Sequence, residues 1–332
     1  MTTFLIRRFG QLMFTLLAGY TLLFLLFFAL PGDPARKLAG GEGRAAPPAV
    51  VENIRVKYGL DKPIYEQYLV RLKETVTLSG RSFKTQESVR DMVAERLPNS
   101  LRLATWAIII ESCVGISLGV LSARRRGSVS DAATTIGAAL AGAIPVFILA
   151  FLIRQVTGVY AFKHDWPEIL RFPPLGIGPD EWYLGIIPSL AQLEYLIQPA
   201  IVLASVSTAI VARLTRTTML EAGSSDHVRT ARAKGLNSRT VVTRHTLRNA
   251  LIPVVTFIGI DFGTLVGFAV LTETVFNWPG IGSKVAQAAA ASDFPVMLSL
   301  SMVVMLVYGL ANLAVDLSYA KLDPRIRFAG AK

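Results

Sequence analysis

Long apolar stretches alternate with polar segments along this chain. Each apolar stretch reaches about 20 residues, the length at which a helix crosses the hydrocarbon core of a bilayer. The first stretch is longer than the core of a signal peptide, about 7–15 residues, so we expect it to remain in the protein. We therefore predict an all-α polytopic membrane protein with six spans, at about residues 9–30, 101–123, 131–153, 187–212, 251–271 and 294–315.

The polar stretch 31–100 is too long for a structureless loop in a compact protein. Apolar residues recur at helical spacing from Ile64 to Val76, and Pro63 suits the first position of that helix. A shorter helix is expected to end before Pro98. We therefore predict a small helical subdomain between the first two spans, on the outer side of the membrane.

Positive charge collects on one side of the predicted spans. Arg7 and Arg8 precede the first span, and the three arginines at 124–126 follow the second. The positive-inside rule places these residues and both termini in the cytoplasm. The predicted regions are a cytoplasmic N-terminus with the first span at 1–30, the extracytoplasmic subdomain at 31–100, a membrane core at 101–316 that includes a cytoplasmic segment at 213–250, and a cytoplasmic tail at 317–332.

Composition supports a membrane protein and argues against nucleic acid as a partner. Of 332 residues, 52% are hydrophobic and 17% charged, and the formal net charge is +11. The arginines stand at the ends of apolar spans, where membrane topology requires them, so lipid rather than nucleic acid is the expected contact. Cys113 is the single cysteine, which excludes an internal disulfide. Pro145 is expected to kink the third span.

Residues 213–250, which we name the platform, are the one long polar segment predicted on the cytoplasmic side. The platform carries eight Lys or Arg residues against two acids. Asp226 suits the N-cap of a short helix, and Gly235 suits the left-handed C-cap that ends it. Asn237 or Ser238 is expected to cap a second short helix that leads to the next span. The pattern favours a protein docking surface, with a basic loop against anionic lipid headgroups as the alternative.

The sequence lacks the patterns of a catalytic or metal site. Residues 280–284 contain the letters of a phosphate-binding loop in the wrong order. His164, His227 and His245 are scattered without the spacing of metal ligands. We therefore expect no ATP hydrolysis, no metal and no enzymatic activity in this chain.

Four segments together resemble the permease subunits of bacterial ATP-driven importers of dipeptides and oligopeptides, a family that also includes nickel importers. They are 30–35 (LPGDPA), 58–63 (YGLDKP) with 67–69 (QYL), 229–236 (RTARAKGL) with 244–245 and 247–253 (LRNALIP), and 273–276 (ETVF) with 278–280 (WPG). Glu221 and Ala222 look like the start of the Glu-Ala-Ala motif of the wider importer superfamily. Counting back from Gly235 instead places that motif at Arg229, with its proline at Pro253.

The resemblance implies a multi-pass subunit of the bacterial inner membrane that forms half of a translocation path. Its implied partners are a second homologous permease, two ATPase subunits and an extracytoplasmic solute-binding protein. ATP and Mg would be used by the ATPases, and this chain would bind no cofactor. The residues implied to dock the ATPase are His227, Val228, Arg229, Thr230, Ala231, Arg232, Ala233, Lys234, Gly235 and Leu236.

The alternatives lie in the cargo and in the class of protein. Peptide is the expected cargo, and nickel or another small solute is the alternative, although the spans contain no His or Cys cluster that would favour a metal. An ion channel or a membrane scaffold would also have basic inner loops, but it would need no ATPase.

Two acids stand inside predicted spans, near the bilayer midplane. Glu111 and Asp261 each lie about ten residues from a span end, which corresponds to about 15 Å of helix. A carboxylate facing lipid costs several kcal/mol, so each should face the bundle interior or a water-filled path. In one interpretation they are protonated or hydrogen-bonded between packed helices. In the other they line the path and present negative charge to the amino terminus of a passing peptide.

Overall fold

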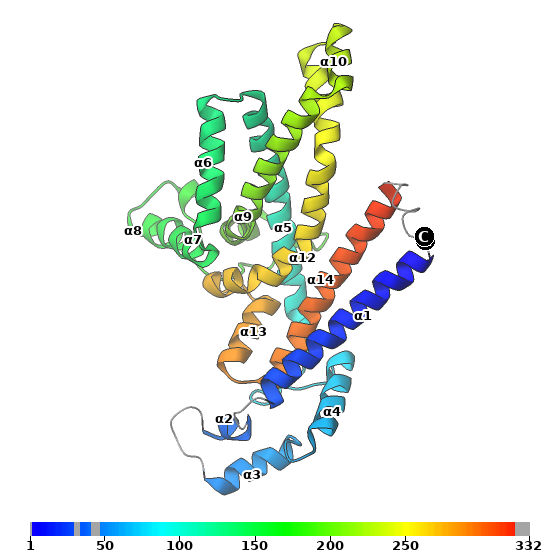
Figure 1. Cartoon of the computed structure of the whole chain (residues 1–332). Coiled ribbons are helices and arrows are strands. Elements are labelled where there is room, and N and C mark those ends of the chain that lie inside the picture. The colour runs from blue at the N-terminus through cyan, green and yellow to red at the C-terminus, as the bar shows by residue number, and fades with distance from the viewer. Residues whose placement is uncertain (1, 30–33, 41–46, 323–332) are drawn as a thin grey trace. The chain divides into compact units, whose positions relative to one another are not determined.

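The computed structural model describes residues 2–29, 34–40 and 47–322, and nearly all of them are helical (Figure 1). The chain divides into two compact units, unit 1 with residues 1–100 and 279–332, and unit 2 with residues 101–278. Most of the 30–35 motif, and the end of the basic tail from residue 323 on, lie outside the described residues.

Six helical segments of the described chain are long and apolar enough to cross a membrane. They are Ile6–Phe28, Val89–Arg124, Val146–Lys163, Leu190–Ser224, Ser238–Phe276 and Phe294–Leu317. The all-α class and the number of spans are thus confirmed. The third differs from the predicted 131–153, because the helix breaks at Pro145.

The break at Pro145 separates two helices that the sequence analysis joined into one kinked span. α6 Val129–Ala143 ends before Ile144, whose ψ of 122° is extended, and α7 Val146–Ile153 begins after the proline. The ring of a proline disfavours helical backbone in the residue before it, so the chain turns fully instead of bending. α7 continues through a π-helical segment, η2 Arg154–Tyr160, into α8 Ala161–Lys163.

At Pro98 the helix does not break: α5 Val89–Arg124 continues through the proline. The predicted stop before Pro98 is therefore wrong. Neighbouring side chains hold the helix at this point: Asn99 Nδ2 donates to the Pro279 carbonyl at 3.2 Å, and Ser100 Oγ accepts from Ile281 N at 2.8 Å. These tertiary bonds offset the backbone hydrogen bond that proline removes.

Unit 1 is a helical body built around α14. Its elements are α1 Thr2–Phe24, η1 Leu25–Ala29, α2 Pro34–Gly40, α3 Pro48–Lys57, α4 Ile64–Thr77, the start of α5, α13 Ile281–Ala290 and α14 Phe294–Leu322. α14 packs against α1, α4 and α13. Val89, Met92, Ile281, Val296 and Leu300 form a buried apolar cluster at its centre. α4 begins one residue after Pro63, close to the predicted start.

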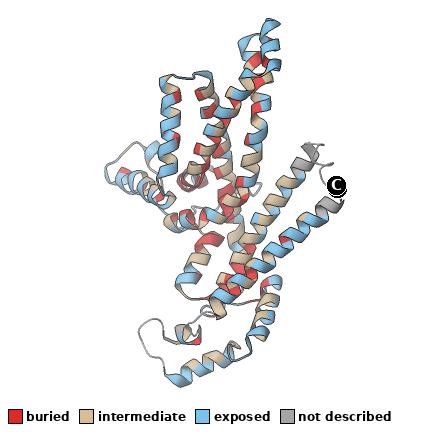
Figure 2. Cartoon of the chain, in the orientation of Figure 1, coloured by how far each residue is buried: buried red, intermediate tan, exposed pale blue. Residues whose placement is uncertain are grey.

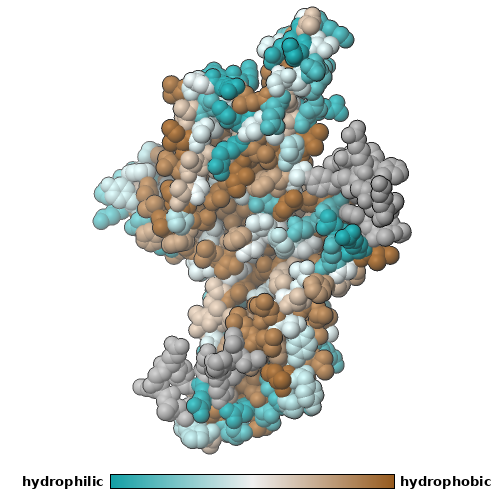
Figure 3. All heavy atoms as spheres, in the orientation of Figure 1, coloured by the Kyte–Doolittle hydropathy of each residue, from teal (hydrophilic) through white to brown (hydrophobic). Residues whose placement is uncertain are grey.

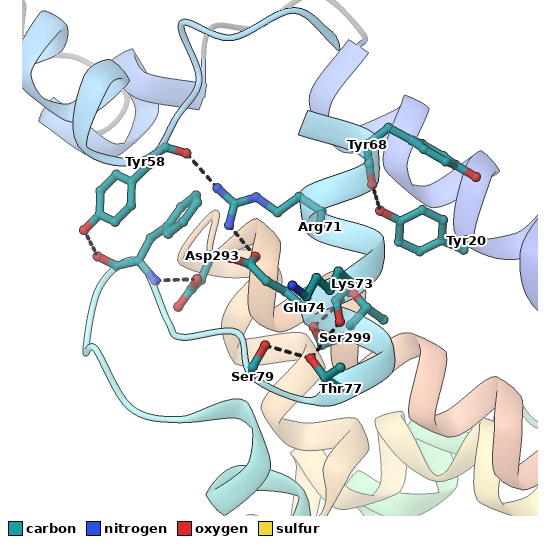
Figure 4. A network of polar contacts seen from close by, with 12 residues as sticks. Tyr20, Tyr58, Tyr68, Arg71, Lys73, Glu74, Thr77, Ser79, Asp293 and Ser299 are labelled. Carbon is teal, nitrogen blue, oxygen red and sulfur yellow. Dashed lines mark hydrogen bonds and ion pairs between the residues drawn. The ribbon is translucent and has the colours of Figure 1, made fainter. Parts of the chain in front are cut away.

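A polar network fixes the 58–83 stretch of unit 1 (Figure 4). The Tyr58 hydroxyl donates to the Phe83 carbonyl at 2.8 Å, and Arg71 donates to the Tyr58 carbonyl at 2.7 Å. Arg71 also pairs with Glu74 at 2.6 Å. Asp293 accepts a bond from Phe83 N at 3.0 Å, which ties the stretch to the start of α14. Contacts within residues 58–83, together with the bond to Asp293, therefore hold this part of the predicted subdomain in place.

Unit 2 contains the rest of the membrane core. Besides α5 to α8 it comprises η3 Glu168–Leu170, the antiparallel hairpin of β1 Trp182–Tyr183 and β2 Ile187–Pro188, α9 Leu190–Ser224, α10 Asp226–Ala233, α11 Ser238–Thr240, η4 Val241–Leu247 and α12 Arg248–Phe276. α9 packs against α6, α7 and α12. Its apolar window is 61% buried, against 17–33% for the other spans, so α9 is the central helix of this unit (Figure 2).

Two glycines bring α5 unusually close to α9. A Cβ at Gly115 would lie 2.7 Å from Val211 Cγ1, and a Cβ at Gly119 would lie 2.6 Å from the Ala212 carbonyl oxygen. Residues four apart share a helix face, so these glycines form one groove that receives α9. The spacing is present in the sequence, but our sequence analysis did not identify it.

Candidate functional site

In the platform of unit 2, α10 and α11 pack against η4 between the end of α9 and the start of α12. Val228 and Ala231 of α10 are buried together with Val241 of η4. The other side chains of α10 face outward, and those of Asp226 and Arg229 are 98% and 76% exposed. Figure 3 shows hydrophilic surface at the α10 end of unit 2 and hydrophobic surface over the helices next to it. α10 is thus an amphipathic helix that is anchored on one face and free on the other.

The turn after α10 has the predicted backbone. Gly235 has φ +74°, and its N–H donates to the Arg232 carbonyl at 2.9 Å. A Cβ at this glycine would meet nothing within 4 Å, so only the backbone conformation requires glycine there. Asn237 caps the next helix, because its side chain accepts from Arg239 N at 2.7 Å. The predictions for Gly235 and Asn237 are confirmed.

The start of α10 differs from the prediction. Ser225, not Asp226, occupies the N-cap position, and it makes no side-chain cap bond. The Ser225 hydroxyl instead donates to the Ala222 carbonyl at 2.5 Å, which turns it back toward α9. Asp226 is the first helical residue, where its negative charge still complements the helix dipole.

The predicted second short helix is not separate from the fifth span. α11, η4 and α12 follow one another without a break from Ser238 to Phe276, a segment of 39 residues. The π-helical segment η4 has the backbone that accommodates an extra residue without ending the helix. The platform is therefore continuous with the span that carries Asp261.

Two parts of one resembling segment, the stretches 229–236 and 244–253, lie close together in the platform. His227 at the start of α10 lies with its Nε2 atom 2.9 Å from Nδ2 of Asn249 in α12. The same ring nitrogen lies 3.3 Å from the His245 carbonyl. The contact joins His227, two residues before the 229–236 stretch, to the 244–253 stretch.

An ion pair stabilises the start of the platform. The sequence pattern did not predict it. Arg216 of α9 binds Asp131 of α6 through two bonds, Nε to Oδ1 at 2.7 Å and Nη2 to Oδ2 at 2.9 Å. Ser122 of α5 donates to the same carboxylate, and Gly127 N does so at 2.9 Å. The Arg216 guanidinium, followed by the Ser122 and Gly127 bonds, lowers the pKa of Asp131 well below its ordinary value. One carboxylate thus fastens three helices.

The two intramembrane acids are brought together in unit 2. The carboxyl groups of Glu111 on α5 and Asp261 on α12 lie against each other. Glu111 is fully buried and Asp261 is 8% exposed. Neither oxygen of Glu111 has a hydrogen-bond partner, and Oδ2 of Asp261 has none either. No group of three or more His, Cys, Asp or Glu residues that could hold a metal ion occurs within the described ranges.

Comparison with known proteins assigns the family. Residues 115–328 match the family described as "Binding-protein-dependent transport system inner membrane component". Residues 1–104 match the family that describes the N-terminal part of such membrane components. The chain is 35% identical to the dipeptide transport system permease protein DppB of Escherichia coli K12, covering 98% of this chain and 99% of that protein.

Two further relatives have similar coverage. The di/tripeptide transport system permease protein DppB of Pseudomonas aeruginosa is 36% identical over 98% of this chain and 99% of its own length. The glutathione transport system permease protein GsiC of Escherichia coli K12 is 35% identical over 99% of this chain and 100% of its own. In such importers separate ATPase subunits hydrolyse ATP, and the permease itself is not an enzyme. With its six apolar helices, this chain therefore belongs to the family of binding-protein-dependent transport system inner membrane components, as a multi-pass permease subunit of an ATP-driven importer.

Proposed function

We propose that this chain imports short peptides as one half of a translocation path, paired with a second homologous permease and served by two ATPase subunits and an external solute-binding protein. ATP and Mg act in the ATPases, and the chain needs no cofactor of its own. Both termini and the platform face the cytoplasm, and the 31–100 subdomain faces outward toward the binding protein. Arginines at the ends of the second and fourth spans support this orientation.

The ATPase docks on the segment from His227 to Leu236. The observation that carries this proposal is the anchoring of α10 by Val228 and Ala231, which leaves a rigid, charged outer face. A groove on a partner receives such a helix through its exposed side chains. Because α10 is joined to α9 through Ser225 and to α12 through η4, motion of the ATPase would reach both helices together.

Gly235→Val tests the docking proposal. Left-handed backbone costs a β-branched residue about 1–2 kcal/mol, so the turn should shift and displace the docking face. Peptide uptake by the reconstituted importer should fall, while membrane insertion of the chain is retained. Gly185→Val is the matched control, because Gly185 has φ +75° and equally open surroundings but lies in the β1–β2 hairpin. Normal uptake by the Gly235 variant, or an equal loss in both variants, would contradict the proposal.

Peptide is the cargo that the relatives' names favour, since all three are permeases for dipeptides, di/tripeptides or glutathione. Nickel is the alternative cargo. Uptake of a radiolabelled dipeptide and of nickel ions by the same proteoliposomes separates the two. Nickel uptake without peptide uptake would overturn the choice.

Glu111 and Asp261 line the path in this proposal. A carboxylate at this depth lowers the electrostatic barrier for a peptide's charged amino terminus without binding it firmly. Asp261→Asn keeps shape and hydrogen bonding, so it should slow import of peptides with a free amino terminus more than import of N-acetylated ones. Equal slowing of both would leave only a packing role.

A further inference from the structure

The carboxyl groups of Glu111 and Asp261 lack a hydrogen-bond donor. Three of their oxygens, both of Glu111 and Oδ2 of Asp261, are buried without a partner. The two groups lie against each other, yet carboxylates only accept hydrogen bonds. Buried polar atoms in folded proteins are nearly always paired, so something must supply the missing donor.

No side chain on the packed helices supplies a compensating charge. α9 packs against α5 at Gly115 and Gly119, and it also packs against α12. The stretches 103–123 of α5, 195–212 of α9 and 249–272 of α12 contain no Lys, Arg or His, and no acid other than this pair. Their remaining titratable groups are Cys113, which is exposed, and Tyr195 at the end of α9. Two adjacent carboxylates in such surroundings repel strongly, because the low dielectric hardly screens them.

We propose that the pair is a proton-binding site, in which Glu111 holds a proton and donates it to Asp261. One proton removes one of the two charges and provides one hydrogen-bond donor, which pairs one oxygen of Glu111 with an oxygen of Asp261. Glu111 is assigned as the donor because both of its oxygens are buried without a partner, whereas only Oδ2 of Asp261 is in that position.

Release of this proton would open the contact between α5 and α12. When water reaches the pair, the O–H bond of Glu111 breaks, the proton passes to water, and two facing carboxylates remain. The hydrogen bond between the helices is then replaced by repulsion. The pair therefore holds the helices together at lower pH, and this contribution is lost as the pH rises. The inference rests on the membrane location of these helices and not on the identity of the cargo.

Infrared spectroscopy of the assembled importer in lipid tests the proposal. At neutral pH the wild-type importer should show the carbonyl stretch of one protonated carboxyl group per copy of this chain, and Glu111→Gln should remove it. Asp316→Asn is the control, because Asp316 instead pairs with a cation, Arg8, at 3.1 Å. Equal absorbance in the wild type and in Glu111→Gln would overturn the proposal, whether or not the importer transports peptide.

A second variant covers the case in which Glu111→Gln does not assemble. Asp261→Asn replaces the acceptor of the proposed bond, so the protonated carboxyl should persist with its carbonyl frequency shifted. An unchanged frequency would show that the proton is not shared with Asp261, and loss of the band would show that Glu111 does not hold it.

Discussion

A methyl group added at Gly119 tests the close packing of α5 on α9. In the Gly119→Ala variant the new Cβ would lie 2.5 Å from Thr215 Cβ and 2.6 Å from the Ala212 carbonyl oxygen, whereas ordinary contacts begin at 3.4 Å. The helices must separate by about 1 Å, which forfeits up to about half of the attraction in neighbouring contacts. The clash includes the backbone carbonyl oxygen of Ala212 in α9, so a rotamer change alone cannot relieve it.

The size of the effect follows from two opposing contributions. Overpacking of this kind costs about 1–3 kcal/mol. Alanine also favours the helical backbone over glycine by about 1 kcal/mol, which offsets part of that cost. Gly137→Ala is the matched control: Gly137 lies in α6, and its new Cβ would meet nothing within 4 Å. The difference between the two variants should therefore equal the cost of overpacking.

Thermal unfolding of the purified chain in detergent measures that difference. Gly119→Ala should melt about 2–12 °C below Gly137→Ala, since each kcal/mol shifts the Tm of a body of this size by about 2–4 °C. Gly115→Ala should lie between them, because its shortest contacts, 2.7 Å to Val211 Cγ1 and 2.8 Å to Val211 Cβ, are longer than those at Gly119. Equal melting temperatures for the Gly119 and Gly137 variants would refute the account of α5–α9 packing.

Two further predictions concern the helix ends at residues 124–131. Replacing the three arginines at 124–126 by Asn should weaken the orientation of the neighbouring spans, seen as altered labelling of cysteines placed in the turn at 127–130; unchanged cytoplasmic labelling would count against a topological role. Asp131→Asn should lower the melting temperature at neutral pH, since it breaks the paired bonds with Arg216. Because the pKa of Asp131 is lowered, the wild-type advantage should be constant above the ordinary carboxyl range and shrink only as the pH falls below it. An advantage that disappears already in mildly acidic buffer would contradict the pairing.

The sequence was sufficient for features that depend on local pattern. Apolar runs placed five of the six spans, because a span needs little more than length and the absence of charge. The left-handed turn at Gly235 and the cap at Asn237 could also be predicted, since each depends on the intrinsic preference of one residue.

Features that depend on tertiary contacts could not be predicted in this way. The same residue type gave opposite outcomes at Pro98 and Pro145, and the hydrogen bonds that Asn99 and Ser100 make hold the helix at Pro98. The bond between Asp131 and Arg216 joins residues 85 positions apart, and no periodicity relates them. The sequence placed Glu111 and Asp261 at a similar depth, but only the fold shows that they face each other.

The docking of an ATPase on α10 is the central claim, and site-directed photo-cross-linking tests it most directly. Replacing Cys113, the single cysteine, by Ser allows one probe-bearing cysteine to be introduced by Arg229→Cys, on the exposed face of α10. A parallel chain carries Tyr183→Cys in the β1–β2 hairpin, where Tyr183 is 65% exposed. In the assembled importer the probe at position 229 should cross-link to an ATPase subunit, and the probe at 183 should not. Cross-linking of the ATPase from 183, or its absence at 229 in an importer that still transports, would contradict the account.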